Sequence, residues 1–394
     1  MGKKTELAPT TQSPLRAVLV AVSTQNQPAA QTWQYLEELS FLAKTVQIQT
    51  AGFFTQNLPH PDARTYIGKG KLQELQGYVQ AYPVEMIIFD DQLSPLQFRS
   101  LEKALPDQRI LDRGLLILEV FNERAATASA KLQVQLARLE YLYPRLPRNQ
   151  SAPVEQKDAG KLGKTGETEL ENTRKTVKNR MLLLRDKLEK ISLQSATQGQ
   201  QRNGIVRVTL VGYTNVGKSS LMRHLSRADV YIKDELFATV ESTVRRAQID
   251  HLSFLLTDTV GFIRKLPDML IDSFKSTLDQ VRQADILLHV ADISHPACQQ
   301  QIQVVRKMLT QIGAGHIPTL LVYNKIDLLG KDGLAGLDQL QNKEDATSLT
   351  DYGNEVFISI EKDDNLQNLH KLLAAMILER QLHLYPLAVP AMIF

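Results

Sequence analysis

The sequence predicts an α/β protein with a small N-terminal parallel α/β domain, a long helical hairpin, and a C-terminal P-loop domain whose sheet is doubly wound and mostly parallel. Three observations predict it. Apolar runs alternate with amphipathic segments up to residue 113, apolar residues then recur at heptad-like spacing, and a glycine-rich loop follows an apolar run that begins at residue 205. We expect a disordered tail at residues 1–14, the α/β domain at residues 15–113 and the hairpin at residues 114–192. A linker at residues 193–203, the P-loop domain at residues 204–382 and a second tail at residues 383–394 should follow.

The alternation in the N-terminal domain predicts four strands and three helices. The strands are expected at residues 17–22, 46–54, 85–91 and 110–112, and the helices at residues 31–44, 71–82 and 95–105. The run Tyr-Ile-Gly-Lys-Gly-Lys at residues 66–71 lies before a helix, as a phosphate-binding loop does. A Gly-rich turn with solvated lysines explains the same residues, so a second, ATP-binding site at this loop is an open alternative.

Two apolar stripes between residues 114 and 192 predict the arms of an antiparallel helical hairpin. Their members are spaced by three and four residues, and they are Leu132, Leu136, Leu139, Tyr143 and Leu146, then Val177, Met181, Leu184, Leu188 and Ile191. Between the arms, residues 147–168 are rich in Pro, Gly, Ser and Lys and predict a long tip loop.

The basic charge of the chain is concentrated in this hairpin. Residues 145–190 hold 12 Lys and Arg against 7 Asp and Glu, a net charge of +5, whereas the whole chain carries +3. A projecting basic hairpin suits RNA phosphates. A solvated helical face is the alternative interpretation.

The most informative motif is Gly-Tyr-Thr-Asn-Val-Gly-Lys-Ser at residues 212–219, between an expected strand and an expected helix. Backbone N–H groups of such a loop surround the α- and β-phosphates, Lys218 reaches the β- and γ-phosphates, and the Ser219 hydroxyl ligates Mg²⁺. Asn215 either helps to bind a monovalent cation or stabilises the loop. The candidate nucleotide-binding residues here are Gly212, Tyr213, Thr214, Asn215, Val216, Gly217, Lys218, Ser219 and Ser220.

Three further motifs follow expected strands in the order that a guanine-nucleotide domain requires. They supply Asp258, Thr259, Val260 and Gly261, then Asn324, Lys325, Ile326 and Asp327, and last Ser359, Ile360 and Glu361. Asp258 would hold a metal-bound water, and the Gly261 N–H would face the γ-phosphate. The Asp327 carboxylate can accept from guanine N1–H and the exocyclic amine, whereas adenine would leave it unpaired. The third motif is degenerate, because such a loop usually reads Ser-Ala-Lys.

Composition narrows the class of protein. At 394 residues the chain is long enough for two or three domains. Its one cysteine, Cys298, excludes an internal disulfide framework and a Cys-based zinc site, and favours a reducing, cytoplasmic compartment. No uncharged apolar run of about 18 residues predicts a membrane span, and the N-terminus lacks a signal peptide or a myristoylation signal. We expect a monomer.

With these residues in hand, the chain resembles the HflX family of translational GTPases over nearly its full length. The most specific matches lie outside the general nucleotide motifs, at residues 66–71, 111–113, 130–142, 166–171, 236–239 and 258–267. The resemblance implies a GTPase that binds GTP, GDP and Mg²⁺ and associates with the large (50S) ribosomal subunit. It also implies an N-terminal domain that reaches toward the peptidyl-transferase region, and a role in splitting or rescuing stalled ribosomes.

Within this resemblance we expect the first switch to supply Phe237, Ala238, Thr239, Val240 and Glu241. Thr239 would join Ser219 on Mg²⁺, with Thr243 as the alternative, and the expected catalytic residues are Lys218, Thr239 and Gly261. Phe262 stands where many small GTPases carry a water-orienting Gln. A phenyl ring cannot orient water by hydrogen bonding, so we expect slow intrinsic hydrolysis that a partner stimulates. The alternative role of Phe262 is a hydrophobic anchor.

The chain departs from the family pattern in four places. Residues 160–167 are shorter than the usual Gly-rich segment and lack its Pro, so the tip of the hairpin is altered. The usual Asp-Pro-Thr reads Glu241-Ser242-Thr243, and the last base-binding loop carries Ile360. Only 12 residues follow position 382, so we expect no extra C-terminal domain. The competing hypothesis is an RNA-binding module whose nucleotide state acts only as a regulator.

Overall fold

The computed structural model describes residues 15–146, 162–199, 205–226, 243–265, 267, 275–329 and 354–384. They form two compact units. The first unit extends to Val120 and includes Leu142–Arg148, and the second comprises Phe121–Tyr141 and the chain from Asn149 onward. Among the described residues, no helix is long and apolar enough to span a membrane.

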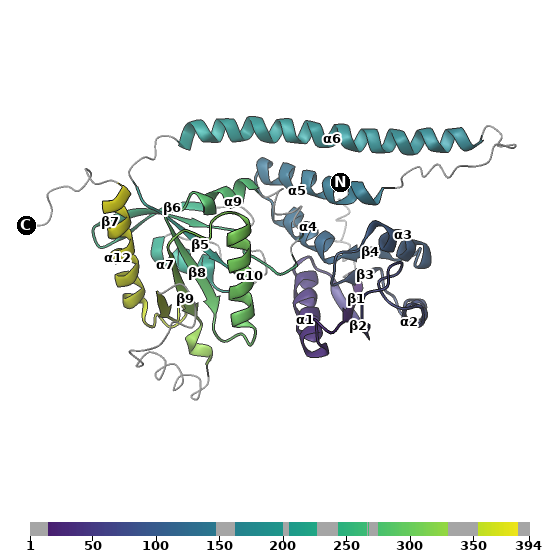
Figure 1. Ribbon diagram of the computed structural model, residues 1–394, viewed down its shortest axis with the longest axis horizontal. Helices are drawn as coiled ribbons and strands as arrows, with labels where there is room; N and C mark the ends of the chain where they lie inside the picture. The colour runs from purple at the N-terminus through teal and green to yellow at the C-terminus, as the bar shows by residue number, and fades with distance from the viewer. Residues whose placement is uncertain are drawn as a thin grey trace, which may run out of the picture. The chain divides into compact units, whose positions relative to one another are not determined.

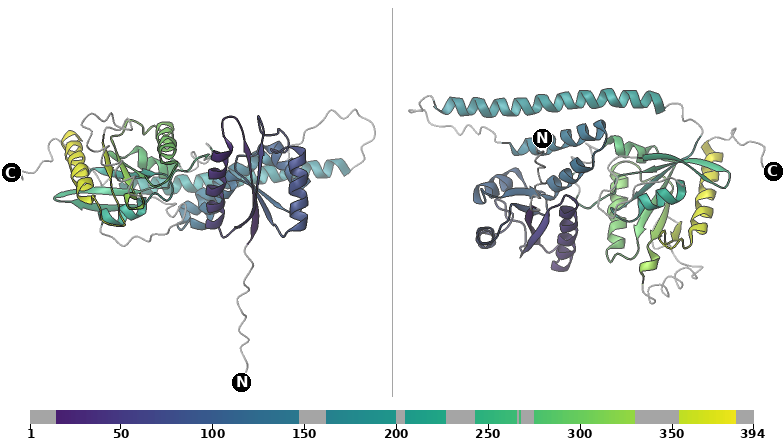
Figure 2. Two further views of the ribbon diagram at one scale, coloured as in Figure 1. Left: turned by 90° about the horizontal axis from the view of Figure 1, so that it is seen from below. Right: turned by 180° about the vertical axis from the view of Figure 1, so that it is seen from behind.

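The first unit is a four-stranded parallel sheet with helices on both faces (Figures 1 and 2). Its strands are β1 (Arg16–Ser23), β2 (Gln49–Asn57), β3 (Met86–Phe89) and β4 (Arg109–Asp112), in the order β2-β1-β3-β4. Its helices are α1 (Ala29–Thr45), α2 (Lys69–Ala81) and α3 (Pro95–Ala104). Alternate β1 residues, Val18, Val20 and Val22, pack in one core with Leu75 of α2 and Leu101 of α3. The parallel α/β fold predicted for this region is therefore confirmed.

Buried ion pairs hold the carboxyl edge of this sheet together. Arg113, only 1% exposed, pairs with Asp90 at 2.8 Å and with Glu38. Asp112 accepts from the Leu115 N–H at 3.0 Å, which starts the next helix, and it also pairs with Arg145. The Leu-Asp-Arg signature at residues 111–113 therefore has a structural role. The pair with Arg145 also explains why the turn at Tyr143–Arg145 belongs to the first unit, although the sequence assigned it to the hairpin.

The helical region contains α4 (Arg113–Arg124), α5 (Ala128–Leu142), the 3₁₀ turn η1 (Tyr143–Arg145) and α6 (Leu162–Gly199). Helices α5 and α6 lie antiparallel in Figure 1, and the Arg185 guanidinium on α6 is 2.6 Å from the Glu140 carboxylate on α5. Every predicted apolar position on α6 is less exposed than the described residues beside it, and Leu184 is 1% exposed. The antiparallel hairpin is therefore confirmed.

Two predicted boundaries of this hairpin are wrong. The tip loop was expected to reach residue 168 and the linker to begin at residue 193, but α6 already begins at Leu162 and continues to Gly199. Residues 193–199 are mostly Gln, Ser, Ala and Thr, and residues 162–168 include Leu, Lys and Glu beside two glycines. Each residue added to an existing helix gains a backbone hydrogen bond without a new nucleation cost. The remainder of the tip, residues 147–161, lies outside the described residues.

The second unit contains a six-stranded sheet in the order β10-β9-β8-β5-β7-β6. Its strands are β5 (Arg207–Gly212), β6 (Thr243–Ile249), β7 (Leu252–Asp258), β8 (Ile286–Asp292), β9 (Thr319–Asn324) and β10 (Glu355–Phe357), and only β6 is antiparallel to its neighbour. Helices α7 (Lys218–Ser226), α9 (Lys275–Arg282), α10 (Cys298–Gln311) and α12 (Leu366–Leu384) flank it (Figure 1). The predicted doubly wound, mostly parallel sheet is confirmed, and α12 ends two residues beyond the expected boundary at 382.

Candidate functional site

The phosphate-loop motif lies between β5 and α7, at the carboxyl edge of the sheet, where α/β folds bind ligands. Two of its glycines are required by close contacts. A Cβ on Gly212, which has φ of +150°, would lie 2.2 Å from the Val290 carbonyl oxygen on β8. A Cβ on Gly217, which has φ of +100°, would lie 2.4 Å from the Asn324 side-chain nitrogen. The loop therefore fits against the neighbouring strand ends only with glycine at these positions.

Lys218, the first residue of α7, is 7% exposed and points back into the loop. Its ammonium donates to the carbonyl oxygens of Gly212 at 3.2 Å and Tyr213 at 2.7 Å. Burial lowers the pKa of Lys218 to about 8, and the Asp258 carboxylate opposes part of that shift. A buried ammonium so held provides a fixed positive charge for an anionic ligand.

The metal-binding candidates also meet at this edge. The Ser219 hydroxyl donates to the Asp258 carboxylate at 2.7 Å, across 39 residues of sequence. Thr259 next to Asp258 turns inward, because its hydroxyl donates to the Leu210 carbonyl of β5 at 2.7 Å. Ser219 and Asp258 are therefore available to the site, whereas the Thr259 side chain stabilises the strand end.

The segment after β7 is bonded directly to the phosphate loop. The Thr214 N–H donates to the Phe262 carbonyl at 2.9 Å, and the Phe262 N–H donates to the Gly212 carbonyl at 3.0 Å. The Phe262 ring is 2% exposed. A Cβ on Gly261 would lie within 3 Å of both Thr214 and the Lys218 ammonium. Phe262 is therefore a buried anchor as well as a residue that cannot orient water, and glycine is the residue type that fits at position 261.

Asn324, at the end of β9, connects three loops of the candidate site. It is 4% exposed, its side-chain nitrogen donates to the Val216 carbonyl at 3.0 Å, and its side-chain oxygen accepts from the Ile360 N–H at 3.2 Å. One side chain thus fixes the phosphate loop, its own motif and the candidate base-binding loop at residues 359–361 relative to one another.

Lys325 adopts a left-handed backbone with φ of 68°, and its ammonium donates to the Asn215 carbonyl at 3.1 Å. The same ammonium is 2.7 Å from the carboxylate of Asp292, which ends β8. Asp292 was missed in the sequence, although a charged residue at the end of the apolar run 286–292 was a usable signal.

Asp327, the expected base-reading carboxylate, accepts a hydrogen bond from the Ser359 hydroxyl at 2.6 Å. Ser359 is fully buried and also accepts from the Lys362 N–H at 3.1 Å. Ile326 is buried, and its N–H donates to the Ile358 carbonyl at 3.3 Å. The degenerate last motif therefore does reach Asp327, the candidate base-reading residue, through Ser359.

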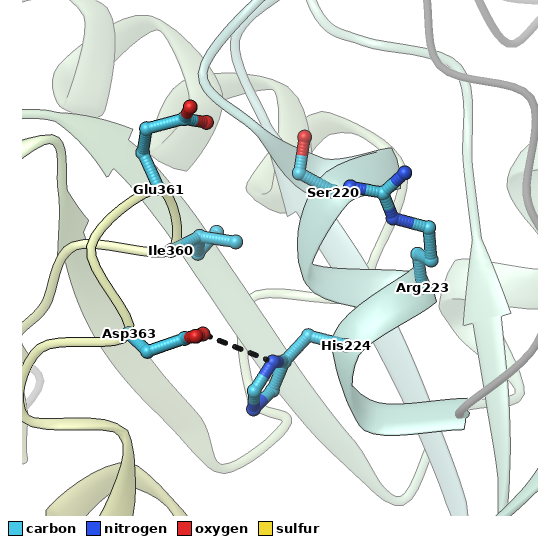
Figure 3. A pocket seen from close by; sticks show the side chains of 6 residues that line it. All are labelled: Ser220, Arg223, His224, Ile360, Glu361 and Asp363. Carbon is cyan, nitrogen blue, oxygen red and sulfur yellow. Dashed lines mark ion pairs between the residues drawn. The ribbon is translucent and has the colours of Figure 1, made fainter.

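A pocket of about 490 Å³ opens between α7 and this last loop (Figure 3). The side chains that line it come from both elements and are Ser220, Arg223, His224, Ile360, Glu361 and Asp363. Figure 3 shows His224 directed at Asp363, with His224 Nδ1 3.7 Å from an Asp363 carboxylate oxygen. Arg223 and His224 were not identified from the sequence, because no phosphate-loop motif extends to that turn of the helix.

The first-switch candidates Phe237, Ala238, Thr239, Val240 and Glu241 lie outside the described residues. The alternative, Thr243, is the first residue of β6 and is paired with Asp258 in the sheet register. Val260 is half-buried between Thr259 and Gly261.

Two donors of the Gly-Lys loop at residues 66–71 have protein partners. The Gly68 N–H donates to the Gln56 side chain at 2.8 Å, and the Lys71 ammonium pairs with Glu74 at 2.7 Å and lies over the Phe54 ring. These contacts favour the interpretation as a structured turn over that of a second phosphate site.

Comparisons with known proteins agree with this geometry. Residues 33–122 match the family described as GTP-binding GTPase N-terminal, residues 124–202 match GTP-binding GTPase Middle Region, and residues 207–325 match 50S ribosome-binding GTPase. The chain is 46% identical over 312 residues to GTPase HflX of Flavobacterium psychrophilum, covering 79% of this chain and 75% of that protein. It is 41% identical over 298 residues to GTPase HflX of Escherichia coli, covering 75% of this chain and 70% of that protein.

Among solved structures, the crystal structure of SsGBP in complex with GDP covers 93% of this chain and 100% of that chain, with 25% identity and a TM-score of 0.50. Relatives at this level of identity over most of the chain, together with the three matched regions, establish the family. This chain belongs to the HflX family of ribosome-associated, GTP-hydrolysing proteins.

Proposed function

We propose that this GTPase binds GTP or GDP with Mg²⁺ at the carboxyl edge of the six-stranded sheet and acts on the large ribosomal subunit to split or rescue stalled ribosomes. The observation that carries the proposal is the convergence of Lys218, Ser219 and Asp258 at one end of the edge with Asn324, Asp327 and Ser359 at the other. Cytoplasmic location and a monomeric state are part of the proposal.

In this proposal the phosphate loop positions the substrate. Backbone N–H groups of residues 215–219 and the N-terminus of α7 face the phosphates. The Lys218 ammonium neutralises charge that develops on the β–γ bridging oxygen, and the Gly261 N–H binds the γ-phosphate. Phosphoryl transfer depends mainly on such positioning and charge stabilisation.

The donor set fits Mg²⁺, which prefers hard oxygen ligands and keeps several waters. The Ser219 hydroxyl and the Asp258 carboxylate already lie 2.7 Å apart, so they provide one direct ligand and one acceptor for a metal-bound water. Thr239 would be the second protein ligand. No group of three His, Cys, Asp or Glu within the described ranges could hold a metal, which suits an ion bound largely by nucleotide and water. When bound, Mg²⁺ supplies charge neutralisation for the β- and γ-oxygens.

Hydrolysis should be slow in the isolated protein. Phe262 is held on both sides by the phosphate loop and its ring is buried, so it offers no polar group to the attacking water. A partner that supplies or orders a water-positioning group would then accelerate the reaction. This partner is the ribosomal subunit in our proposal.

The hairpin formed by α5 and α6 is the proposed ribosome-binding element. Its exposed surface on α6 includes Lys175, Lys178 and Arg180. Lysine and arginine on such a surface neutralise RNA phosphates and release counterions. We propose that the shortened tip, residues 147–161 with the first turn of α6, governs splitting after docking, whereas the charged helix provides affinity.

The test is co-sedimentation with 50S and 30S particles in the GTP-analogue, GDP and nucleotide-free states, together with GTPase rates with and without 50S particles. We expect binding that favours 50S and the GTP-analogue state, with stimulated hydrolysis. Binding that is independent of nucleotide, without stimulation, would favour the RNA-binding module instead. A Gly/Ser replacement of residues 160–164 should leave affinity in place and lower splitting.

A further inference from the structure

Thr214 carries a hydroxyl in the phosphate loop that none of the four nucleotide motifs requires. The residue is 6% exposed, and its side-chain oxygen is buried without a hydrogen-bond partner in the part of the chain that the structure describes. A buried hydroxyl that is left unpaired is unfavourable, and such groups in native proteins call for an explanation. By contrast, the buried Thr319 hydroxyl donates to the Ile317 carbonyl at 2.9 Å.

The surroundings of Thr214 indicate what its hydroxyl could bind. The point where a Cβ of Gly261 would lie is 2.8 Å from the Thr214 methyl carbon and 2.9 Å from the Lys218 ammonium. The Thr214 backbone is fixed there, because its N–H donates to the Phe262 carbonyl at 2.9 Å. The methyl and the hydroxyl share one carbon, so a rotation of about 120° about the Cα–Cβ bond brings the hydroxyl to the place of the methyl and the methyl to the place of the hydrogen. The hydroxyl can therefore face the same point as the ammonium.

We infer that the Thr214 hydroxyl donates a hydrogen bond to a γ-phosphate oxygen of GTP and so contributes to the discrimination of GTP from GDP. The inference rests on the proposed function, which places the γ-phosphate between Lys218 and Gly261. GDP lacks the oxygen that the hydroxyl would contact. During hydrolysis the water oxygen bonds to the γ-phosphorus, the bond to the β–γ bridging oxygen breaks, and the water proton passes to the phosphate products. Thr214 stabilises the terminal oxygens without exchanging a proton.

The test uses Thr214→Val, which keeps the shape and removes the hydroxyl, and Thr214→Ser, which keeps the hydroxyl. Affinities for GDP and for a non-hydrolysable GTP analogue are measured by calorimetry, and thermal stability is measured without nucleotide. A hydrogen bond from a neutral hydroxyl to a charged phosphate oxygen is strong enough to change the affinity for the nucleotide by about tenfold. We therefore expect Thr214→Val to bind the analogue about tenfold more weakly, to bind GDP as the wild type does, and to unfold at a higher temperature without nucleotide.

Thr319→Val is the matched control, because it makes the same change at a buried threonine whose hydroxyl has an acceptor. It should lower the unfolding temperature and leave the ratio of the two affinities unchanged. Thr214→Ser should keep the wild-type ratio. An unchanged ratio in Thr214→Val, or an equal loss for GDP and the analogue, would overturn the inference. If the wild type binds neither nucleotide, the proposed function itself fails, so the two failures are distinguishable.

Discussion

The replacement Asp327→Asn tests the base-reading contact most directly. In the wild type both carboxylate oxygens are acceptors, and one of them already accepts from the Ser359 hydroxyl at 2.6 Å. In the variant, the Ser359 hydroxyl still needs an acceptor, so the amide oxygen of the introduced asparagine should occupy the position of the carboxylate oxygen that Ser359 contacts in the wild type. The amide NH₂ would then take the place of the other oxygen and face the base. Guanine presents an amino donor there, and two donors would oppose each other.

The size of the effect follows from these contacts. A hydrogen bond to a charged group contributes about 1.5–3 kcal/mol. Losing one such bond and leaving two donors opposed should weaken GTP binding by about 3 kcal/mol, which corresponds to a factor of about 150. Xanthine carries a carbonyl in place of the amine and can accept from the new NH₂ group. The variant should therefore prefer xanthosine triphosphate.

The assay is displacement of a fluorescent GDP analogue by GTP, xanthosine triphosphate and ATP, with a fluorescent xanthine nucleotide for the variant. Ser359→Ala alone should weaken guanine binding only modestly, whereas combined with Asp327→Asn it should reduce the preference for xanthine, because the amide is no longer oriented. Equal affinity of the wild type for ATP and GTP would refute the reasoning. A variant that loses GTP without gaining the xanthine nucleotide would refute the assigned orientation.

Three further predictions concern the phosphate loop and the hairpin. The pKa of Lys218 is lowered to about 8 in the nucleotide-free protein, and bound phosphates should raise it, so nucleotide binding above pH 8 should take up a proton. The affinity for nucleotide should therefore fall by at most about tenfold per pH unit above pH 8. Calorimetry at pH 9 in two buffers measures the proton uptake, and Lys218→Ala should show none. In the nucleotide-free protein this lysine binds fewer protons folded than unfolded between its pKa of about 8 and its ordinary pKa of 10.5, so its effect on stability becomes more favourable as the pH rises through that range and is constant above it. Lys218→Ala and Ser219→Ala should each impair hydrolysis yet leave a protease-resistant fragment that ends beyond Gly199 of α6; circular dichroism showing global unfolding would contradict this. Neutralising four basic residues of α6 should lower both the affinity for 50S particles and its dependence on salt, and an unchanged salt slope would exclude them as phosphate contacts; these residues are Arg174, Lys175, Lys178 and Arg180.

Most of the fold and the local motifs could be predicted from the sequence, because each depends on neighbouring residues. Apolar runs of about four to eight residues marked the strands, and the spacing of three and four residues marked the seam that contains Leu184. The ends of α6 could not be predicted in this way. Polar residues that suit a loop also extend a helix once it has formed, so composition misplaced both boundaries.

The sequence by itself predicted the chemistry of this protein: a phosphate loop at residues 212–219, a base-reading carboxylate at Asp327 and a basic hairpin. Such chemistry needs particular residue types at fixed local spacing, which a linear sequence records. Only the tertiary structure decided how these parts are joined. Asn324 bonds to Val216 across 108 residues and Lys325 to Asn215 across 110, while Asp292 meets Lys325 because β8 lies beside β9. The order of strands in the sheet sets these contacts, and no local pattern encodes that order.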